Sequence, residues 1–447
     1  MSTLTAEAPM RAPAPPAAPV PAPPVPLRRN RDFQILWSGR AVSTLGNEVS
    51  ELAYPLIMLA VTGSAGYAGM LGAAQLLTAL LTALPAGLLA DRGNRRAIMM
   101  TGNLARATAL GVLAFAVLNG FASIPLIIGT AIVSAFFGAL FNPAAAAALK
   151  QLVPPSQLPE AMAQNQARMF GAELAGPPIG GWLLSLGRAV PFVFDAITFV
   201  LGTIALLFIR RPLQGKRSAT SARRPALGDL TAGLRHLFAD RRLRMLMLWA
   251  MGVNFAFGGF HLILIATWHK RGVADTAIGV LAAVIAVGGL LGALMSGRIL
   301  KSARPTPLII GLAFCVPFLV AALGVIPGTL AIAVLCCAIT FFVPALNTLV
   351  FTYVVSGTPD ELQGRVSAGA AFLAQGLQPL APLLFGTVFD LGGPPAAFGV
   401  MGGVTLVAAL ATLSRHLRGL PRPGELAEVQ GASGGSQRGT QDPQDEP

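Results

Sequence analysis

Twelve apolar runs, each about 20 residues or longer, follow one another along this chain, most of them separated by short polar intervals. A helix needs about 20 consecutive apolar residues to cross the hydrocarbon core of a bilayer. Charged residues make up only 11% of the 447 residues. A soluble protein carries about 25%, because its surface must be wetted. The sequence therefore predicts an all-α integral membrane protein.

The predicted spans form two groups of six, with a charged interval between them. The first group covers about 34–61, 66–90, 97–118, 124–147, 165–186 and 190–209. The second covers about 245–267, 277–297, 306–326, 328–352, 366–389 and 394–414. The predicted segments are a disordered Pro/Ala-rich N-terminus (1–30), a six-helix half (31–210), a basic linker (211–244), a second six-helix half (245–415) and a disordered tail (416–447). Two similar halves of this kind enclose a midplane cavity in transporters.

Arginine and lysine are concentrated on one side of the predicted bundle. Ten of the 32 lie between Arg210 and Arg244, whereas the opposite side has only Arg188, Lys270 and Arg271. By the positive-inside rule, both termini and the linker are predicted to be cytoplasmic. We expect a multi-pass protein of the cell (inner) membrane, with residues 228–240 forming an amphipathic helix on the inner leaflet.

Several classes of function find no support in the sequence. The net charge of +13 does not indicate a nucleic-acid partner, because the basic residues lie in short clusters between apolar runs. No GxxxxGK[ST] or HExxH string is present. Cys315, Cys336 and Cys337 lie inside apolar runs, without metal or disulfide spacing. The chain is predicted to be neither an enzyme nor a holder of a metal or cofactor.

The interval between the second and third spans reads Gly87-Leu88-Leu89-Ala90-Asp91-Arg92-Gly93-Asn94-Arg95-Arg96. Charged residues at helix ends can contact the termini of neighbouring helices. The string resembles motif A of the major facilitator superfamily, GxLaDrxGrR, with Asn94 in place of a glycine. Both residue types tolerate left-handed backbone. The resemblance implies a gating role for five of these residues, namely Gly87, Asp91, Arg92, Arg95 and Arg96.

A second motif lies in the fifth span and reads Gly176-Pro177-Pro178-Ile179-Gly180-Gly181. It resembles the GPxxGG centre of motif C, which is associated with antiporters. Its small residues would let helices approach closely. Residues 141–154 and 359–366 are similar to the enterobactin-exporter and macrolide-efflux branch. The resemblance implies a major facilitator-type 12-helix bundle with two six-helix halves (6+6).

The chain departs from that branch in two places. Gln151 stands where relatives commonly have an acid able to pair with the motif A arginines, a role that Glu160 could take over. The arginine that drug exporters often carry in the fourth span is absent. Its function, if the chain retains it, would fall to another residue.

The first span contains Arg40, Glu48 and Glu51, which together cost about 8 kcal/mol to place in a membrane. Asn47, Glu48, Glu51 and Tyr54 share one helical face with Thr44, and this face is predicted to line a cavity. Desolvation favours a protonated carboxyl group, which suits reversible protonation. We expect Glu48 or Glu51 to carry a coupling proton or to contact a cationic substrate. The alternative is a structural pair with Arg40 or Arg106.

Asp195 and Glu173 are further cavity candidates, whereas His261 is predicted to be a packed or hydrogen-bonded residue rather than a proton relay. The sequence predicts a monomeric secondary active transporter that couples protons to the efflux of a lipophilic or amphipathic small molecule, such as a drug or secreted metabolite. One alternative is a nutrient importer, which would favour a cavity rich in Asn, Gln or cationic side chains, and the predicted spans are expected to offer few of these. Another is a non-transporting membrane scaffold. Substrate, direction, coupling ion and the choice between Glu48 and Glu51 stay open.

Overall fold

The computed structural model describes residues 26–214, 234–302, 304–356, 358 and 362–415. These residues are almost entirely helical and contain no strand. The first half comprises α1 (Arg31–Thr62), α2 (Ala65–Arg92), α3 (Arg95–Leu118), α4 (Ile124–Leu152), α5 (Leu158–Leu186) and α6 (Val190–Phe208). The second half comprises α8 (Arg241–Gly258), α9 (Phe260–Lys270), α10 (Asp275–Ser302), α11 (Pro305–Ala322), α12 (Thr329–Ser356), α13 (Gln363–Gln375) and α14 (Leu380–Leu410).

The twelve predicted spans are largely helical, but the eleventh is interrupted at residues 376–379, which form a turn between α13 and α14. The seventh span consists of α8 and α9, which are separated at Gly259. The eleventh and twelfth spans meet within α14, where Gly393 leaves the helical conformation with a φ of 69°. The first part of the predicted amphipathic helix lies outside the described residues. Its described end, residues 234–239, is helical, and Leu237 is buried against the second half.

By length and composition, nine helical stretches among the described residues are able to cross a membrane. One of them, Gln363–Leu413, has 51 residues and contains both the eleventh and the twelfth predicted spans. Two long helices, α1 and α5, are not among the nine. Both carry charged residues, and α5 also contains several glycines and prolines. The charged side chains of these two helices therefore need a polar environment inside the bundle.

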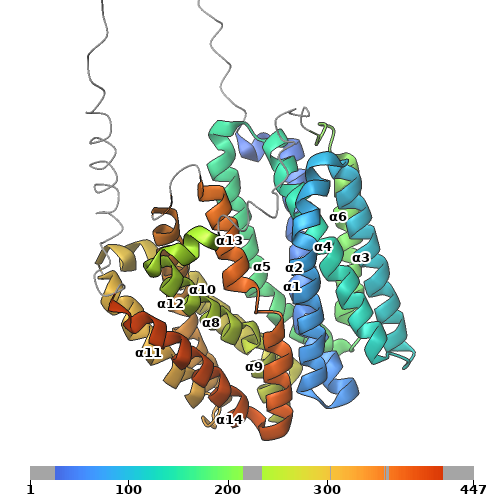
Figure 1. Cartoon of the computed structure of the whole chain (residues 1–447). Helices are drawn as coiled ribbons and strands as arrows, with labels where there is room; N and C mark the ends of the chain where they lie inside the picture. Colours follow the sequence, from blue (N-terminus) through green and yellow to red (C-terminus); the bar gives the residue numbers. More distant parts are fainter. Residues whose placement is uncertain (1–25, 215–233, 303, 357, 359–361, 416–447) are drawn as a thin grey trace, which may run out of the picture.

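The two halves lie next to each other, with α1–α6 on the right of Figure 1 and α8–α14 on the left. We call the end of the bundle that contains residues 26 and 415 the terminal end, and the opposite end the far end. Near the terminal end, each half has its own apolar core, around Phe33 and Leu149 in one and Leu246 and Ile309 in the other. A third core runs through both halves and includes Met58, Phe192, Phe260, Phe385 and Phe398. The halves are thus joined towards the far end.

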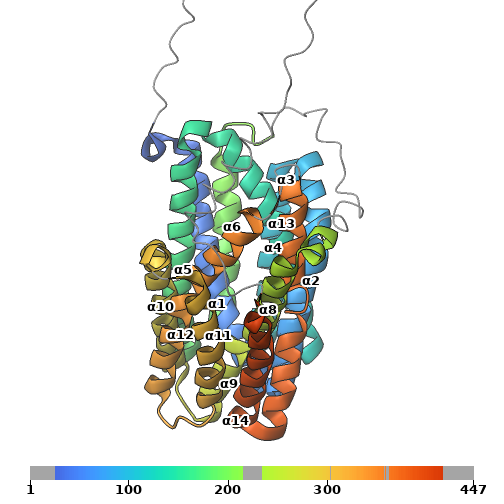
Figure 2. The ribbon, with the colours of Figure 1, turned by 60° about the vertical axis from the view of Figure 1, so that its left-hand side comes forward.

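Two helix pairs join the halves, α5 with α10 and α2 with α14 (Figure 2). Their backbones approach closely at glycines. A Cβ atom added to Gly69 would lie 2.1 Å from the carbonyl oxygen of Pro382, and one added to Gly279 would lie 2.2 Å from that of Pro177. Such contacts need residues without a side chain, and they make the far end of the bundle tightly closed.

An aspartate adds polar bonds to this closure. The carboxylate of Asp390 on α14 accepts hydrogen bonds from Ser64 Oγ at 2.5 Å and from the backbone N–H groups of Ala65 and Gly66, both at 2.8 Å. These donors begin α2, so a charge of one half caps a helix of the other. We call this set of contacts the Asp390 latch. Sequence reasoning missed it, because nothing local links residues 326 positions apart.

Replacing Gly69 with alanine is expected to destabilise the closed far end by about 1–3 kcal/mol, because backbone atoms there cannot make room for a methyl group. The measurement is the melting temperature of the purified protein in detergent. Gly111→Ala is the matched control, since a Cβ there meets nothing within 4 Å. Equal melting temperatures for Gly69→Ala and wild type would contradict the described packing.

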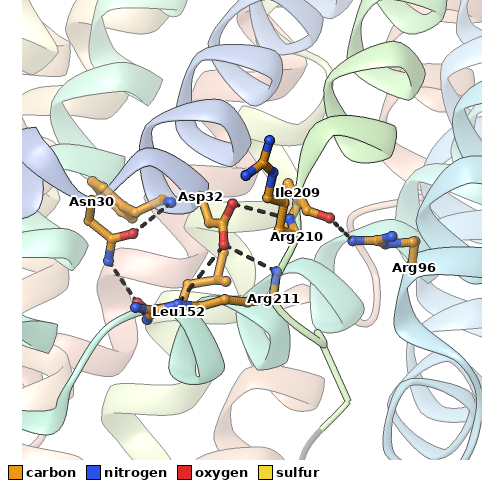
Figure 3. A network of polar contacts seen from close by, with 8 residues as sticks. Asn30, Asp32, Arg96, Leu152, Ile209, Arg210 and Arg211 are labelled. Atoms are coloured by element: carbon orange, nitrogen blue, oxygen red, sulfur yellow. Dashed lines mark hydrogen bonds and ion pairs between the residues drawn. The ribbon is translucent and has the colours of Figure 1, made fainter.

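The terminal end of the first half is held together by a buried aspartate, Asp32, which is 8% exposed. Its carboxylate accepts hydrogen bonds from the backbone N–H groups of Arg210 (3.2 Å) and Arg211 (3.1 Å), and Nε of Arg211 lies 4.0 Å away. Beside it, Nδ2 of Asn30 donates to the carbonyl oxygen of Leu152 at 2.8 Å (Figure 3). These contacts tie the start of α1 to the ends of α4 and α6.

Candidate substrate cavity

A cavity of about 590 Å³ lies between the two halves. Most of its lining comes from α1–α6, and the second half contributes Gly258, His261, Leu262, Ile265 and Pro382. Its polar lining includes Arg40, Ser43, Thr44, Asn47, Ser50, Glu51, Tyr54, Gln75, Asn103, Arg106, Ser134, Asn142, Arg168, Asp195 and His261. The wall of the cavity that the first half forms therefore carries nearly all of its polar side chains, and we call it the polar wall, whereas the second half adds His261.

The polar face of α1 is divided between the cavity and a helix contact. Asn47, Glu51 and Tyr54 line the cavity. Glu48 does not, because its Cβ and Cγ atoms lie against Gly176 of α5. Glu51 is solvent-exposed although it sits within the bundle, since it faces the cavity. The geometry therefore distinguishes two acids that the sequence left equivalent.

Arg106 on α3 lies among the acids of the cavity. Its Nη2 atom donates a hydrogen bond to Oδ1 of Asn47, and its guanidinium stacks over Phe199 at 3.9 Å from the ring centroid. It attracts the charges of both Glu51 and Asp195. Neither carboxylate comes within the 4.0 Å of an ion pair in the described part of the chain. Arg106 thus attracts the charge of Glu51 without forming an ion pair with it.

Asp195 on α6 is the most buried of these acids, at 1% exposed. Its carboxylate accepts hydrogen bonds from Ser50 Oγ at 2.7 Å and Thr198 Oγ1 at 3.1 Å. A Cβ at Gly46 would lie 2.4 Å from Asp195 Oδ1, so α1 and α6 are in close contact here. This acid is occupied by structural bonds, unlike Glu51, for which no hydrogen bond is found in the described structure.

Glu173 on α5 is exposed and lies outside the cavity lining. Its charge acts on Glu48, so the two acids are neighbours at the edge between α1 and α5. His261, expected to be a packed or hydrogen-bonded residue, is instead exposed to the cavity and makes no hydrogen bond in the described structure. Among the described residues of the second half that line the cavity, His261 is the one with an ionisable side chain.

Arg168 was missed by the sequence reasoning, which concentrated on the acids of the fifth span. It is 7% exposed and lines the cavity from α5. Its Nη1 atom donates to the carbonyl oxygen of Arg40 at 3.1 Å and to Oγ1 of Thr44. An ionisable residue inside a predicted span is itself a signal for a functional site, and could have marked this position.

The motif A residues lie at the terminal end of the first half, apart from the cavity. Arg95 donates to the carbonyl oxygens of Ala90 (3.2 Å), Ala147 (3.4 Å) and Leu213 (3.1 Å). Arg96 donates to the carbonyl oxygen of Ile209 (Figure 3). These arginines bind the negative ends of helices.

The other motif A residues make fewer contacts. Gly87 has open space around it. Asp91 and Arg92 are exposed, and neither makes a hydrogen bond or ion pair within the described structure. Glu160 bonds only to Gln164 there, so it does not take the place of the acid absent at Gln151.

The motif C-like segment forms a two-sided helix contact. Gly176 faces Glu48 and Gly180 faces the Val49 carbonyl group, so this side packs on α1. Gly181 faces the carbonyl group of Asp275, and the Pro177 carbonyl group meets Gly279, so the other side packs on α10. The segment therefore sits at a junction between the two halves.

One expectation about the cavity is wrong. The spans had been expected to offer few Asn, Gln or cationic side chains to an interior site. The cavity brings together Asn47, Asn103, Asn142, Gln75, Arg40, Arg106 and Arg168. Five helices contribute one or two of them each, and they form a group only once these helices pack.

The comparisons with known proteins agree with this architecture. The family model described as Major Facilitator Superfamily matches residues 36–382. The multidrug efflux pump Tap of Mycolicibacterium fortuitum is 27% identical over 366 residues, which cover 79% of this chain and 88% of that protein. The enterobactin exporter EntS of Shigella dysenteriae serotype 1 is 26% identical over 412 residues, covering 88% and 95%.

Solved structures share the fold. A POT family transporter in complex with 5-aminolevulinic acid superposes with a TM-score of 0.66 at 14% identity, covering 86% of this chain and 95% of that one. A bacterial homologue of the human lysosomal transporter Spinster, in an inward-facing and unoccupied conformation, gives 0.63 at 18% identity, covering 91% and 96%.

Proposed function

Since this chain belongs to the Major Facilitator Superfamily and is a multi-pass membrane transporter, we propose that it exports a lipophilic or amphipathic small molecule in exchange for protons. The observation that carries the proposal is Glu51. It is a carboxylate inside the bundle that faces the cavity, and it has no ion pair or hydrogen bond among the described residues. Such a group is free to gain and lose a proton.

The surroundings of Glu51 make its charge sensitive to its neighbours. Arg106 attracts it, whereas Asp195 and Glu48 repel it. Tyr54 is one helical turn away on the same wall of the cavity, and His261 faces the cavity from the other half. A bound substrate or a rocking movement of the halves would change this balance, and would thereby couple proton binding to transport.

The orientation of the bundle is compatible with outward transport. By the positive-inside rule, the concentration of arginine and lysine at the terminal end supports a cytoplasmic position for that end. The far end is closed, so the described state would load its substrate from the cytoplasm, as an exporter must. The names of the relatives Tap and EntS, an efflux pump and an exporter, support this direction. Uptake of a small polar solute is the second candidate, favoured by the amides and arginines of the cavity.

The test is dye movement in everted membrane vesicles that contain the full chain. When the vesicle lumen is more acidic than the medium, N-phenyl-1-naphthylamine is expected to accumulate in the lumen in exchange for protons that leave it. An uncoupler should abolish the accumulation, and vesicles without the protein provide the control. Dye movement that is independent of the protein or of the gradient would contradict proton-coupled efflux, and movement in the opposite direction would favour uptake.

A further inference from the structure

Two arginines of the cavity have no acidic partner in the part of the chain that the structure describes. Arg40 on α1 and Arg168 on α5 both line it. In the described ranges, neither guanidinium has a carboxylate oxygen within 4.0 Å, and the one salt bridge found there joins Asp32 and Arg211. The charges of Arg40 and Arg168 repel each other. The cavity therefore holds two neighbouring cations without a counter-charge, which is costly inside a membrane protein.

Arg168 is fixed in a position that leaves part of its guanidinium unused. The side chain is 7% exposed, and Nη1 is held by the Arg40 carbonyl group and by Thr44. Its Nε atom is buried and has no hydrogen-bond partner in the described part of the chain. A buried donor of this kind costs about as much as a lost hydrogen bond unless a ligand accepts from it.

Arg106 differs from these two arginines in its charge environment. Its Nε atom is also buried without a hydrogen-bond partner in the described structure, but its charge is offset by Glu51 and Asp195, and its Nη2 atom is bonded to Asn47. The polar wall is thus divided into an acidic part around Glu51 and an arginine part around Arg40. These two residues are eleven positions apart on α1, or about 16 Å along the helix axis.

We infer that Arg40 and Arg168 form a subsite for the anionic group of an organic substrate, such as a carboxylate, sulfonate or phenolate. Guanidinium groups bind such groups with paired, charge-assisted hydrogen bonds. The cavity, at about 590 Å³, is much larger than an inorganic anion, and side chains such as Phe199, Leu262 and Ile265 offer apolar contacts to the rest of the molecule. The inference rests on the proposed function in one respect, namely that this cavity holds the substrate.

The anion subsite and the proton site are separable. Across about 16 Å, one charge changes the affinity for another by about 1.5-fold in water and by about six-fold at the dielectric constant of about 20 that suits protein sites, which is less than the loss expected from an arginine substitution. We therefore expect the protein to bind an anionic ligand in preference to a neutral one even when binding is measured without a proton gradient. A failure of proton coupling would leave that preference intact, and a failure of the preference would leave proton coupling intact.

The experiment measures binding to the full chain in lipid nanodiscs by equilibrium dialysis, with empty nanodiscs subtracted. The two probes are 1-anilino-8-naphthalenesulfonate and N-phenyl-1-naphthylamine, which share an aromatic body and differ by the sulfonate. We expect Arg40→Gln and Arg168→Gln each to weaken sulfonate binding by about ten-fold or more, while binding of the neutral probe changes less than about two-fold. Arg40→Lys should retain part of the sulfonate affinity, because it keeps the charge.

Arg188→Gln is the matched control, since Arg188 is exposed and lies outside the cavity. The Arg40 side chain donates no hydrogen bond in the described structure, so Arg40→Gln keeps the test valid even if Arg168→Gln fails to fold. Equal loss of both probes in Arg40→Gln, or unchanged sulfonate binding in both glutamine variants, would overturn the inference. Displacement of the sulfonate by inorganic phosphate as readily as by naphthalene-1-sulfonate would overturn the requirement for an organic body.

Discussion

Glutamine at position 51 is expected to abolish proton-driven transport while leaving the protein folded and inserted. The amide has nearly the shape of the protonated carboxyl group but cannot release a proton, so the cavity would be held in one charge state. In everted vesicles, dye accumulation by Glu51→Gln should fall to the level seen without a gradient. Exchange of labelled for unlabelled dye at equal pH should persist, because it needs no net proton movement.

Two further glutamate variants make this result specific. Glu160→Gln is the matched control, since Glu160 is exposed and bonds only to Gln164 in the described structure. Glu48→Gln is expected to have a smaller effect than Glu51→Gln, because Glu48 lies against Gly176 and outside the cavity lining. Full proton dependence in Glu51→Gln would show that the coupling proton binds elsewhere, with Glu48 the next candidate.

Removal of the Asp390 latch is expected to open the far end. Asp390→Ala takes away the acceptor of three hydrogen bonds between the halves. Asp390 is exposed, so solvent screens its charge and reduces the effect. We expect the equilibrium to move by about 1–2 kcal/mol, or roughly five- to thirty-fold, away from the described state. Spin labels at Asn119 and Gly328, both exposed at the far end, would report a larger population of long distances.

Asp275→Ala is the appropriate control for the latch. Asp275 is an acid at the same end, in the first turn of α10, and its side chain makes no hydrogen bond or ion pair within the described residues. The three native cysteines would be replaced in every variant, so that only the introduced positions carry labels. If Asp390→Ala and Asp275→Ala gave the same distance distributions, the latch would have no part in the conformational equilibrium.

The anion subsite and the proton site lead to different kinds of loss. An Arg40 variant should lose the preference for anionic over neutral substrates, whereas a Glu51 variant should no longer couple transport to the proton gradient. Because the residues lie at separate parts of one helix face, these two properties should vary independently for most single substitutions. A double variant at both positions is expected to show both defects, each as large as in the corresponding single variant.

The sequence by itself determined that the chain lies in a lipid bilayer, where its helices lie along the chain, and that they form two halves. The twelve apolar runs are largely helical, because a chain in lipid must satisfy its backbone hydrogen bonds within each segment, which makes span positions a local property. The motif strings indicated the superfamily for a related reason, since their residues are close in sequence.

Tertiary structure decided which polar side chains meet. The spacing on α1 placed Glu48 and Glu51 on one broad face, but only the packing of α5 separated them, with Glu48 against Gly176 and Glu51 in the cavity. The neighbourhood of Arg40 and Arg168, and the latch from Asp390 to the start of α2, join residues far apart in the chain. Helical periodicity gives a residue's direction around its own axis, whereas its partners depend on how helices pack against one another.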